Sequence, residues 1–162
     1  MSTNNLNVVV LAAGLGTRMK SKLAKVLHRV GGLSLAEHVV NSAAQLTAPE
    51  KITVVVGHQA GEVQAELQNT GVRFVRQAEQ KGTGHALLGC RDLLAPEGGR
   101  VMVLYGDTPL LTAETLRKLE AAHEAGDAAA TMITTTLADP TGYGRGILDS
   151  HGKVLEIVEQ KA

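Results

Sequence analysis

Short apolar runs without polar alternation occur at four places along the chain. Three of them are rich in β-branched residues and cover Val8–Leu11, Ile52–Val56 and Val101–Tyr105, and a shorter one covers Val72–Val75. Such runs are typical of strands that are buried on both faces of a mostly parallel sheet. The pattern therefore predicts a central sheet formed by these four segments.

Between these runs, apolar residues recur at helical spacing. The clearest stripe covers residues 35–44, and Ser34 precedes it with Glu37 three positions later, which is the pattern of a capping box. Further helical stripes fall within residues 63–67, 86–94 and 116–122. Strands that alternate with helices form right-handed βαβ units. We therefore predict a Rossmann-like, doubly wound α/β fold whose ligand site lies beyond the carboxyl ends of the strands.

The last part of the chain has a different pattern. Residues 128–137 and 144–158 are predicted as further strands, and Asp139–Gly142 and Asp149–Gly152 have the composition of turns. No low-complexity tract, repeat or shift in composition divides the sequence. We therefore expect residues 1–162 to form a single domain.

Charge and composition exclude some functional classes. The 16 Lys and Arg residues balance 16 Asp and Glu residues, and only Phe74, Tyr105 and Tyr143 are aromatic. A neutral chain has no long-range field to attract a polyanion, and three aromatic rings cannot supply the stacking surfaces that single-strand binders use. We expect no nucleic-acid partner.

Cysteine usage and the start of the chain bear on the compartment. Cys90 is the only cysteine, so an internal disulfide and a cysteine zinc site are excluded, and its apolar stripe favours a buried, inert thiol. The apolar stretch Val8–Ala13 is too short for the core of a signal peptide or for a membrane span. We expect a cytoplasmic chain with no membrane partner, and the sequence leaves open whether it forms a homo-oligomer.

The first predicted strand runs directly into a loop within Leu11–Met19. Gly14 and Gly16 allow backbone N–H groups to approach a phosphate, and Arg18 adds a positive charge. The segment favours a phosphate-binding loop, although a tight turn between a strand and a helix would use the same glycines. The dinucleotide-binding fingerprint does not fit, since Arg18 stands where its third glycine would be.

Basic residues follow this loop, with no acidic residue before Glu37. Lys20 and Lys22 suit a solvated surface. Lys25 instead lies between apolar residues, which makes it the better candidate for contact with a triphosphate.

Two further segments follow predicted strands. The amide of Gln77 can read the edge of a heterocycle through both its donor and its acceptor, and Gly82–His85 can present backbone groups at a helix entrance, unless the segment is only a flexible helix cap. Asp107 follows the strand that ends at Tyr105. A carboxylate there is suited to a Mg²⁺ ion that bridges phosphate oxygens, and the alternative is a turn before Pro109.

At this point the chain resembles the sugar-phosphate nucleotidyltransferases. Within them it is similar to the uridyltransferase domain of bacterial bifunctional N-acetylglucosamine-1-phosphate uridyltransferase/glucosamine-1-phosphate acetyltransferases. The matching segments are collinear over nearly the whole sequence: Leu11–Met19, Lys25–His28, Gln77–Gln80, Gly82–Ala86, Tyr105–Asp107, Asp139–Arg145 and Val158–Lys161.

The resemblance implies that UTP and N-acetylglucosamine 1-phosphate react to give UDP-N-acetylglucosamine and pyrophosphate, with Mg²⁺ as cofactor. It implies a nucleotide-binding part at about 1–110 and the start of a sugar-binding part at about 128–162. It also assigns roles by position: Arg18 and Lys25 would be catalytic and Asp107 would hold the metal; Leu11, Ala12, Ala13, Gly14, Gly16, Thr17, Lys25, Gln77, Gly82 and Thr83 would bind the nucleotide; and Tyr105, Gly106, Gly144 and Glu159 would bind the sugar.

Two departures from the family pattern are visible. Ala24 stands where the family usually has proline, so we expect a looser Lys25 and predict that proline at position 24 would stabilise the chain. The sequence given also ends before the family's remaining sugar contacts and its hexapeptide β-helix domain, so we expect little turnover from this chain alone. The alternatives are another nucleotidyltransferase that uses CTP or dTTP, and a nucleotide-binding module without catalysis.

Overall fold

The computed structural model describes residues 5–16, 19–126 and 128–159. The chain comprises two compact units, Met1–Lys118 and Leu119–Ala162, and the assignment of residues 1–162 to a single domain stays a prediction. The boundary falls within helix α5 (Ala113–Ala125).

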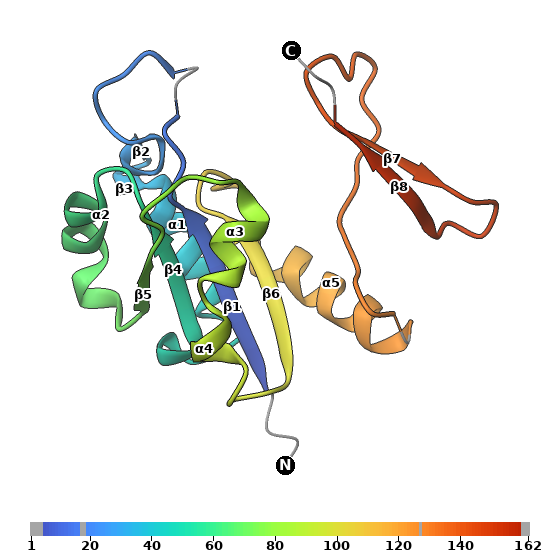
Figure 1. Cartoon of the computed structure of the whole chain (residues 1–162), viewed down its shortest axis with the longest axis horizontal. Helices are drawn as coiled ribbons and strands as arrows, with labels where there is room; N and C mark the ends of the chain where they lie inside the picture. Colours follow the sequence, from blue (N-terminus) through green and yellow to red (C-terminus); the bar gives the residue numbers. More distant parts are fainter. Residues whose placement is uncertain (1–4, 17–18, 127, 160–162) are drawn as a thin grey trace. The chain divides into compact units, whose positions relative to one another are not determined.

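The first unit is built on a sheet of four parallel strands in the order β5-β4-β1-β6 (Figure 1). All four predicted strands are present: β1 (Leu6–Ala12), β4 (Ile52–Val56), β5 (Arg73–Arg76) and β6 (Arg100–Tyr105). The expected burial on both faces is wrong for β6, an edge strand in which Val101, Val103 and Tyr105 are exposed. Strand β1 is central, because it pairs Val8 with Ile52 on one side and Leu11 with Tyr105 on the other. The chain therefore proceeds from β1 to β4 and β5 and then returns to β6 on the opposite side of β1. Such a reversal is where ligands bind in open α/β sheets.

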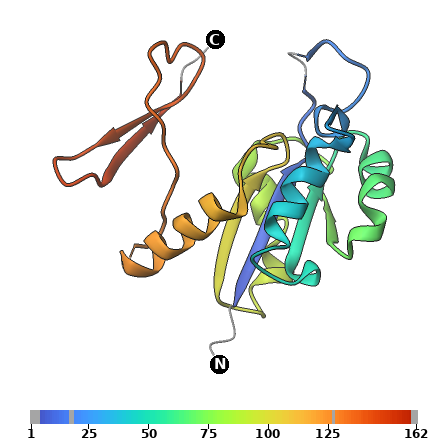
Figure 2. The same cartoon turned by 180° about the vertical axis from the view of Figure 1, so that it is seen from behind.

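Helices cover both faces of this sheet. Figure 1 shows α3 (Thr83–Leu88) and α4 (Arg91–Leu94) in front of it, and the opposite view in Figure 2 shows α1 (Leu35–Ala43) and α2 (Ala60–Leu67) against the other face. Ala86, Cys90 and Leu94 pack with Val9 and Val55 of the strands into a buried cluster. The predicted Rossmann-like α/β fold is confirmed for this unit.

The helical stripe predicted within residues 86–94 is divided between two separate helices, α3 and α4. The backbone N–H of Cys90 donates to the carbonyl of Leu87, three residues back, at 3.0 Å. That tighter turn separates the two short helices while leaving Cys90 on the buried side.

A small hairpin that the sequence analysis did not anticipate precedes α1. Its strands are β2 (Arg29–Val30) and β3 (Leu33–Ser34), and between them Gly31 and Gly32 have φ values of +59° and +90°. Two adjacent glycines at positive φ are suited to a tight hairpin turn. The capping box predicted at the start of α1 is confirmed, since the side chains of Ser34 and Glu37 each bond the backbone N–H of the other.

Among the described residues, the first unit also contains the short 3₁₀ helices η2 (Lys25–Leu27), η3 (Pro49–Lys51) and η4 (Gln68–Thr70).

The second unit has a two-stranded antiparallel sheet of β7 (Arg145–Leu148) and β8 (Val154–Val158), with the predicted turn at Asp149–Gly152 between them. The strand predicted at residues 128–137 is wrong. This segment has no regular structure and every residue in it is exposed, and a strand with no pairing partner leaves its backbone groups unsatisfied. Within the part of the chain that the structure covers, no helix is both long and apolar enough to span a membrane.

Candidate nucleotide-binding site

A cavity of about 540 Å³ opens at the carboxyl ends of β1 and β6. These are the strands at which the chain reverses direction, so the cavity lies where the fold predicts a ligand. Its walls come from the glycine loop, the 3₁₀ helix η2, the segment after β5 and the end of β6. The lining residues are Leu11, Ala12, Ala13, Gly14, Gly16, Met19, Lys25, Val26, Gln77, Gln80, Gly82, Thr83, Ala86, Tyr105 and Asp107.

The glycine loop lies at the mouth of this cavity. Apart from Gly14 itself and its two chain neighbours, no atom of the described residues lies within 4 Å of the position a Cβ would take on Gly14, which leaves space beside its backbone. Gly16 has a φ of +61°, and a Cβ there would lie 2.9 Å from the Cβ of Lys25. The loop and the lysine segment therefore touch at a position that only glycine fits. Thr17 and Arg18, which the sequence analysis assigns to phosphate binding, lie outside the described residues.

Lys25 and Asp107 meet in the cavity although 82 positions of sequence separate them. The Nζ atom of Lys25 lies 2.5 Å from an Oδ atom of Asp107, and the two side chains are 41% and 30% exposed. The lysine comes from η2 and the aspartate from the turn after β6. Two residues that the sequence marks separately thus form one half-exposed ion pair, which a phosphate and a cation can separate.

The backbone before Lys25 is held by a side chain that the sequence analysis missed. Ala24 is buried, with φ −55° and ψ 138°, and its N–H donates to the Oε1 atom of Gln59. Gln59 follows β4 with the left-handed φ of +51° and precedes the first turn of α2. Proline would accept the φ of Ala24 but cannot donate this hydrogen bond. The loss of this hydrogen bond therefore opposes the gain in folding stability that is expected from proline at position 24.

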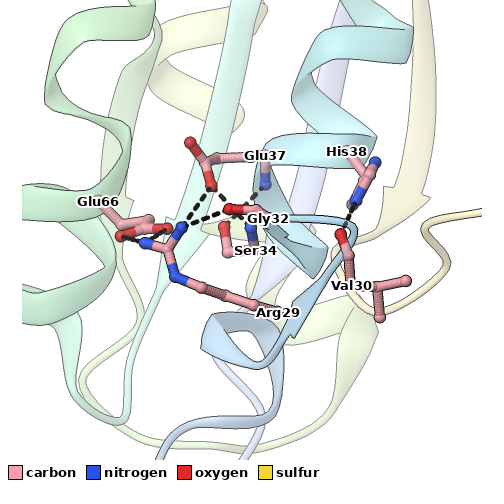
Figure 3. A network of polar contacts seen from close by, with 7 residues as sticks. All are labelled: Arg29, Val30, Gly32, Ser34, Glu37, His38 and Glu66. Atoms are coloured by element: carbon pink, nitrogen blue, oxygen red, sulfur yellow. Dashed lines mark hydrogen bonds and ion pairs between the residues drawn. The ribbon is translucent and has the colours of Figure 1, made fainter.

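The segment after Lys25 is held by the polar network drawn in Figure 3. Arg29 donates from Nη2 to both carboxylate oxygens of Glu66 on α2, at 2.6 and 2.8 Å, and from Nη1 to the carbonyl of Gly32 at 2.8 Å. Glu37 accepts from the N–H of Ser34 at 2.7 Å and lies 3.9 Å from Arg29. The network joins the β2–β3 hairpin to α1 and α2.

Electrostatics in this network favour the ionised carboxylate. The backbone N–H of Ser34, more than any other group, lowers the pKa of Glu37, and the Arg29 guanidinium acts in the same direction. His38 on α1 adds a contact of 2.8 Å from its Nε2 atom to the carbonyl of Val30. Both strands of the hairpin are therefore bonded to α1.

Gln77 forms the far wall of the cavity, next to the start of α3. Its side chain is buried, and its backbone N–H donates to the carbonyl of Val56 at 2.8 Å. Its Nε2 atom donates to the carbonyl of Gly82 at 3.1 Å and lies 3.0 Å from Nδ1 of His85. The donor side of the amide is thus committed to the protein. The expectation that Gln77 reads a base through donor and acceptor together is wrong for this arrangement.

Gly57 is a second feature that the sequence analysis did not mark. A Cβ at Gly57 would lie 2.9 Å from both the Cβ of Ala13 and the Nε2 of Gln80. The chain directly after β4 therefore packs between the glycine loop and the segment after β5 that contains Gln80. A glycine directly after a buried strand was the available signal for this close approach.

The residues assigned to sugar binding fall into two groups. Tyr105 is half exposed and lines the cavity, and the N–H of Gly106 donates to the carbonyl of Leu11 at 2.9 Å. Gly144 and Glu159 belong to the second unit, where a Cβ on Gly144 would lie 3.3 Å from a carboxylate oxygen of Glu159. The latter two therefore lie together within their own unit.

Asp107 is the one carboxylate among the described residues that line the cavity. Among residues 5–16, 19–126 and 128–159, no group of three or more His, Cys, Asp or Glu side chains is arranged to hold a metal. Mg²⁺ in nucleotide sites is held by one or two carboxylates together with the phosphates of the substrate. The donor set therefore fits a metal that is bound together with a nucleotide.

Cys90 has the inert environment that is expected from its place on an apolar helical stripe. It is fully buried and unpaired, and burial raises the pKa of its thiol. A thiol that stays protonated is a poor nucleophile.

Comparison with known proteins shows the family of the chain. The family described as "MobA-like NTP transferase domain" matches residues 8–159. The "Bifunctional protein GlmU" of Solibacter usitatus is 54% identical over 157 residues, which are 97% of this chain and 34% of that protein. The chain spans about a third of the length of such relatives.

Solved structures show the same fold. A nucleotidyl transferase from Methanothermobacter is 26% identical with a TM-score of 0.58, covering 72% of this chain and 56% of that one. HddC from Yersinia pseudotuberculosis is 21% identical with a TM-score of 0.68, and the match covers 96% of this chain and 70% of the HddC chain. This similarity shows a likeness of fold alone.

Proposed function

We propose, since the chain belongs to the MobA-like NTP transferase domain family, that it provides the uridyltransferase part of an enzyme that makes UDP-N-acetylglucosamine. The relatives named "Bifunctional protein GlmU" support this choice within the family, because they match nearly the whole chain at about half identity. The substrates are UTP and N-acetylglucosamine 1-phosphate.

In the proposed reaction, a phosphate oxygen of the sugar phosphate attacks the α-phosphorus of UTP. A new O–P bond forms, the bond between the α-phosphorus and the bridging oxygen breaks, and that electron pair leaves with pyrophosphate. This chemistry needs no covalent protein intermediate, so positioning and charge neutralisation carry the catalysis.

The cavity supports phosphate-side roles for Gly14, Gly16 and Lys25, whereas Thr17 and Arg18 are proposed from the sequence alone. Backbone groups of Gly14, Gly16 and Thr17 would bind the phosphates, and Lys25 and Arg18 would neutralise negative charge on the triphosphate. Lys25 is supported most directly, since its side chain lies in the cavity beside Asp107, the only carboxylate among the described lining residues. A cation held by Asp107 would release Lys25 to contact a phosphate oxygen.

Mg²⁺ is the proposed cofactor, and proteins of this kind generally use a divalent metal. When bound, the ion neutralises phosphate oxygens and orients the leaving pyrophosphate. Asp107 would hold it together with oxygens of the nucleotide.

The base and sugar roles complete the proposal. Leu11, Ala12 and Ala13 form the apolar floor for the nucleoside, and Gln77, Gly82 and Thr83 face the uracil. Tyr105, Gly106, Gly144 and Glu159 are proposed for the sugar.

The observation that carries this proposal is the cavity itself, in which the glycine loop, Lys25, Gln77 and Asp107 converge from four separate segments. Calorimetric titration with UTP, CTP and ATP in the presence of Mg²⁺ tests it. We expect UTP to bind tightest by at least tenfold, because a wrong base leaves buried polar groups unpaired. Equal affinity for UTP and CTP would favour another nucleotidyltransferase.

Turnover separates the enzyme from a module that only binds nucleotide. Because we expect little turnover from this chain alone, pyrophosphate release from UTP and N-acetylglucosamine 1-phosphate is compared between this chain and a longer one of the relatives' length. Release by the longer chain supports the enzyme, and background release by both supports the binding module.

The cytoplasm is the proposed location, supported by the single buried, unpaired cysteine.

A further inference from the structure

The amide of Gln77 has an orientation that can be read from its partners. The carbonyl of Gly82 can only accept a hydrogen bond, so the atom that faces it at 3.1 Å must be the nitrogen of the amide. The Nδ1 atom of His85 lies 3.0 Å from the same nitrogen. A neutral imidazole can accept there when its proton is on Nε2, so both hydrogens of the amide are used within the protein.

Both acceptors are supplied by the start of α3. Gly82 has a φ of +96°, which L side chains rarely adopt, and its carbonyl also accepts the first helical bond, from the N–H of Ala86 at 3.2 Å. His85 follows three residues later, and residues at this spacing share one side of a helix. The entrance of α3 therefore carries two acceptors that point at one buried amide.

We propose that His85 is a positioning residue that fixes the amide of Gln77 with its oxygen toward the base, and thereby sets the preference for uracil over cytosine. This inference rests on the proposed function, because it concerns the same nucleotide site. With Nε2 committed to Gly82 and His85, the side chain offers only Oε1 to a ligand.

The chemistry of the two bases then decides the outcome. The N3 position of uracil carries a hydrogen and donates, whereas N3 of cytosine is an acceptor. An amide oxygen therefore binds uracil and repels cytosine at that position. Rotating the amide by 180° would reverse the preference, but it would also set Oε1 against the Gly82 carbonyl and against the lone pair of His85 Nδ1. Without His85, the Gly82 carbonyl alone opposes that rotation.

The test compares His85→Ala with His85→Asn in the full chain. Alanine removes the acceptor, whereas the Oδ1 atom of asparagine can occupy the position of Nδ1 and accept in its place. The affinities for UTP and CTP are measured by calorimetry at saturating Mg²⁺, with His151→Ala, an exposed turn residue of the second unit, as the control. The readout is the ratio of the two dissociation constants.

We expect the ratio to fall in favour of CTP by about 2- to 10-fold in His85→Ala, the range of a single hydrogen bond. His85→Asn and His151→Ala should stay within about twofold of the parent. A purely structural role would weaken UTP and CTP equally, and an unchanged ratio in His85→Ala would overturn the inference. A parent chain that does not prefer UTP would instead overturn the proposed function.

Discussion

At the residue scale, Ala24 and Gln59 illustrate how a substitution depends on its partner. Proline at position 24 would reduce the freedom of the unfolded chain, which stabilises by about 0.4–1 kcal/mol where the backbone fits. The φ of −55° at Ala24 does fit. However, proline also removes the hydrogen bond to Gln59, which is worth about 0.5–1.5 kcal/mol. The two effects oppose each other at similar size.

We therefore predict that Ala24→Pro leaves the parent unchanged or destabilises it by up to about 1 kcal/mol, and stabilises the Gln59→Ala background by about 0.4–1 kcal/mol. Urea unfolding of the four proteins in this double-mutant cycle measures both values. The same effect of proline in the two backgrounds would show that the N–H of Ala24 contributes nothing to folding.

Asp107 offers a second residue-scale prediction. Asp107→Asn removes the ion pair with Lys25, and because both side chains are substantially exposed the pair contributes at most about 1 kcal/mol to folding. We expect Mg²⁺ to strengthen UTP binding by the parent at least tenfold and by the variant much less, since the variant lacks the charge that would hold the ion. Calorimetry with and without Mg²⁺ measures the difference.

Asp92→Asn, at the exposed start of α4, is the matched control and should keep the full effect of Mg²⁺. If Asp107→Asn kept it too, the metal would be bound by the phosphates without help from this carboxylate.

At the element scale, the β2–β3 hairpin and α1 are joined through ionised Glu37. Hydrogen bonding from the backbone of Ser34 lowers the pKa of Glu37 in the folded state, so the folded chain holds this proton less tightly than the unfolded chain does. The resulting stabilisation is present above the unfolded pKa, near 4.3, and is lost as pH falls through the folded pKa.

We predict that the free energy of unfolding falls less between pH 6 and pH 3 in Glu37→Gln than in the parent. The variant has no charge to lose at this position. Denaturant titrations across that pH range measure it. Glu156→Gln, an exposed residue of β8, should follow the parent. Identical pH profiles for Glu37→Gln and the parent would exclude Glu37 as a source of the pH dependence.

The elements also show which features sequence patterns can predict. The strand runs and the Ser34 capping box depend on local composition, and they form where expected. Residues 128–137 have a strand-like composition but no neighbouring strand to pair with, and pairing is a tertiary property. The turn at Gly31 and Gly32 depends on local composition too, because adjacent glycines favour a tight hairpin turn.

The candidate site also combines features that a single segment predicts with contacts that depend on the tertiary structure. Lys25, Gln77 and Asp107 line one cavity, and the sequence could mark them because each follows a loop or strand end whose direction the fold determines. The contacts of Gln59 with Ala24, and of His85 with Gln77, join segments whose separation in space no single-segment pattern specifies.

At the scale of the whole molecule, the two units differ in how they are stabilised. The first has a sheet with strands buried on both faces, among them Val8–Val10 and Val54–Val56. In the second, all five residues of β8 are exposed, and an isolated two-stranded hairpin is marginally stable in water. The nucleotide cavity is lined by the first unit, whereas Gly144 and Glu159 belong to the second.

We predict that the backbone amides of β7 and β8 exchange at least about a thousandfold faster than those of β1 and β4. Amides of β1 and β4 open only when the first unit unfolds globally, whereas those of β7 and β8 open whenever the hairpin frays. Exchange followed by mass spectrometry or NMR at one protein concentration gives the comparison. Saturating UTP with Mg²⁺ should slow exchange in residues 11–16 and 77–86 without changing β7 and β8, because the cavity residues all come from the first unit.

A second experiment examines what the exposed hairpin contacts. If β7 and β8 exchanged as slowly as β1, their apolar residues, including Leu155 and Ile157, would have to be covered in solution. Protection that rises with protein concentration would identify a second copy of the chain as the cover, since association follows mass action. Protection that is independent of concentration would contradict the prediction of a frayed hairpin. In that case Gly144 and Glu159 would be held rigidly before any sugar phosphate binds.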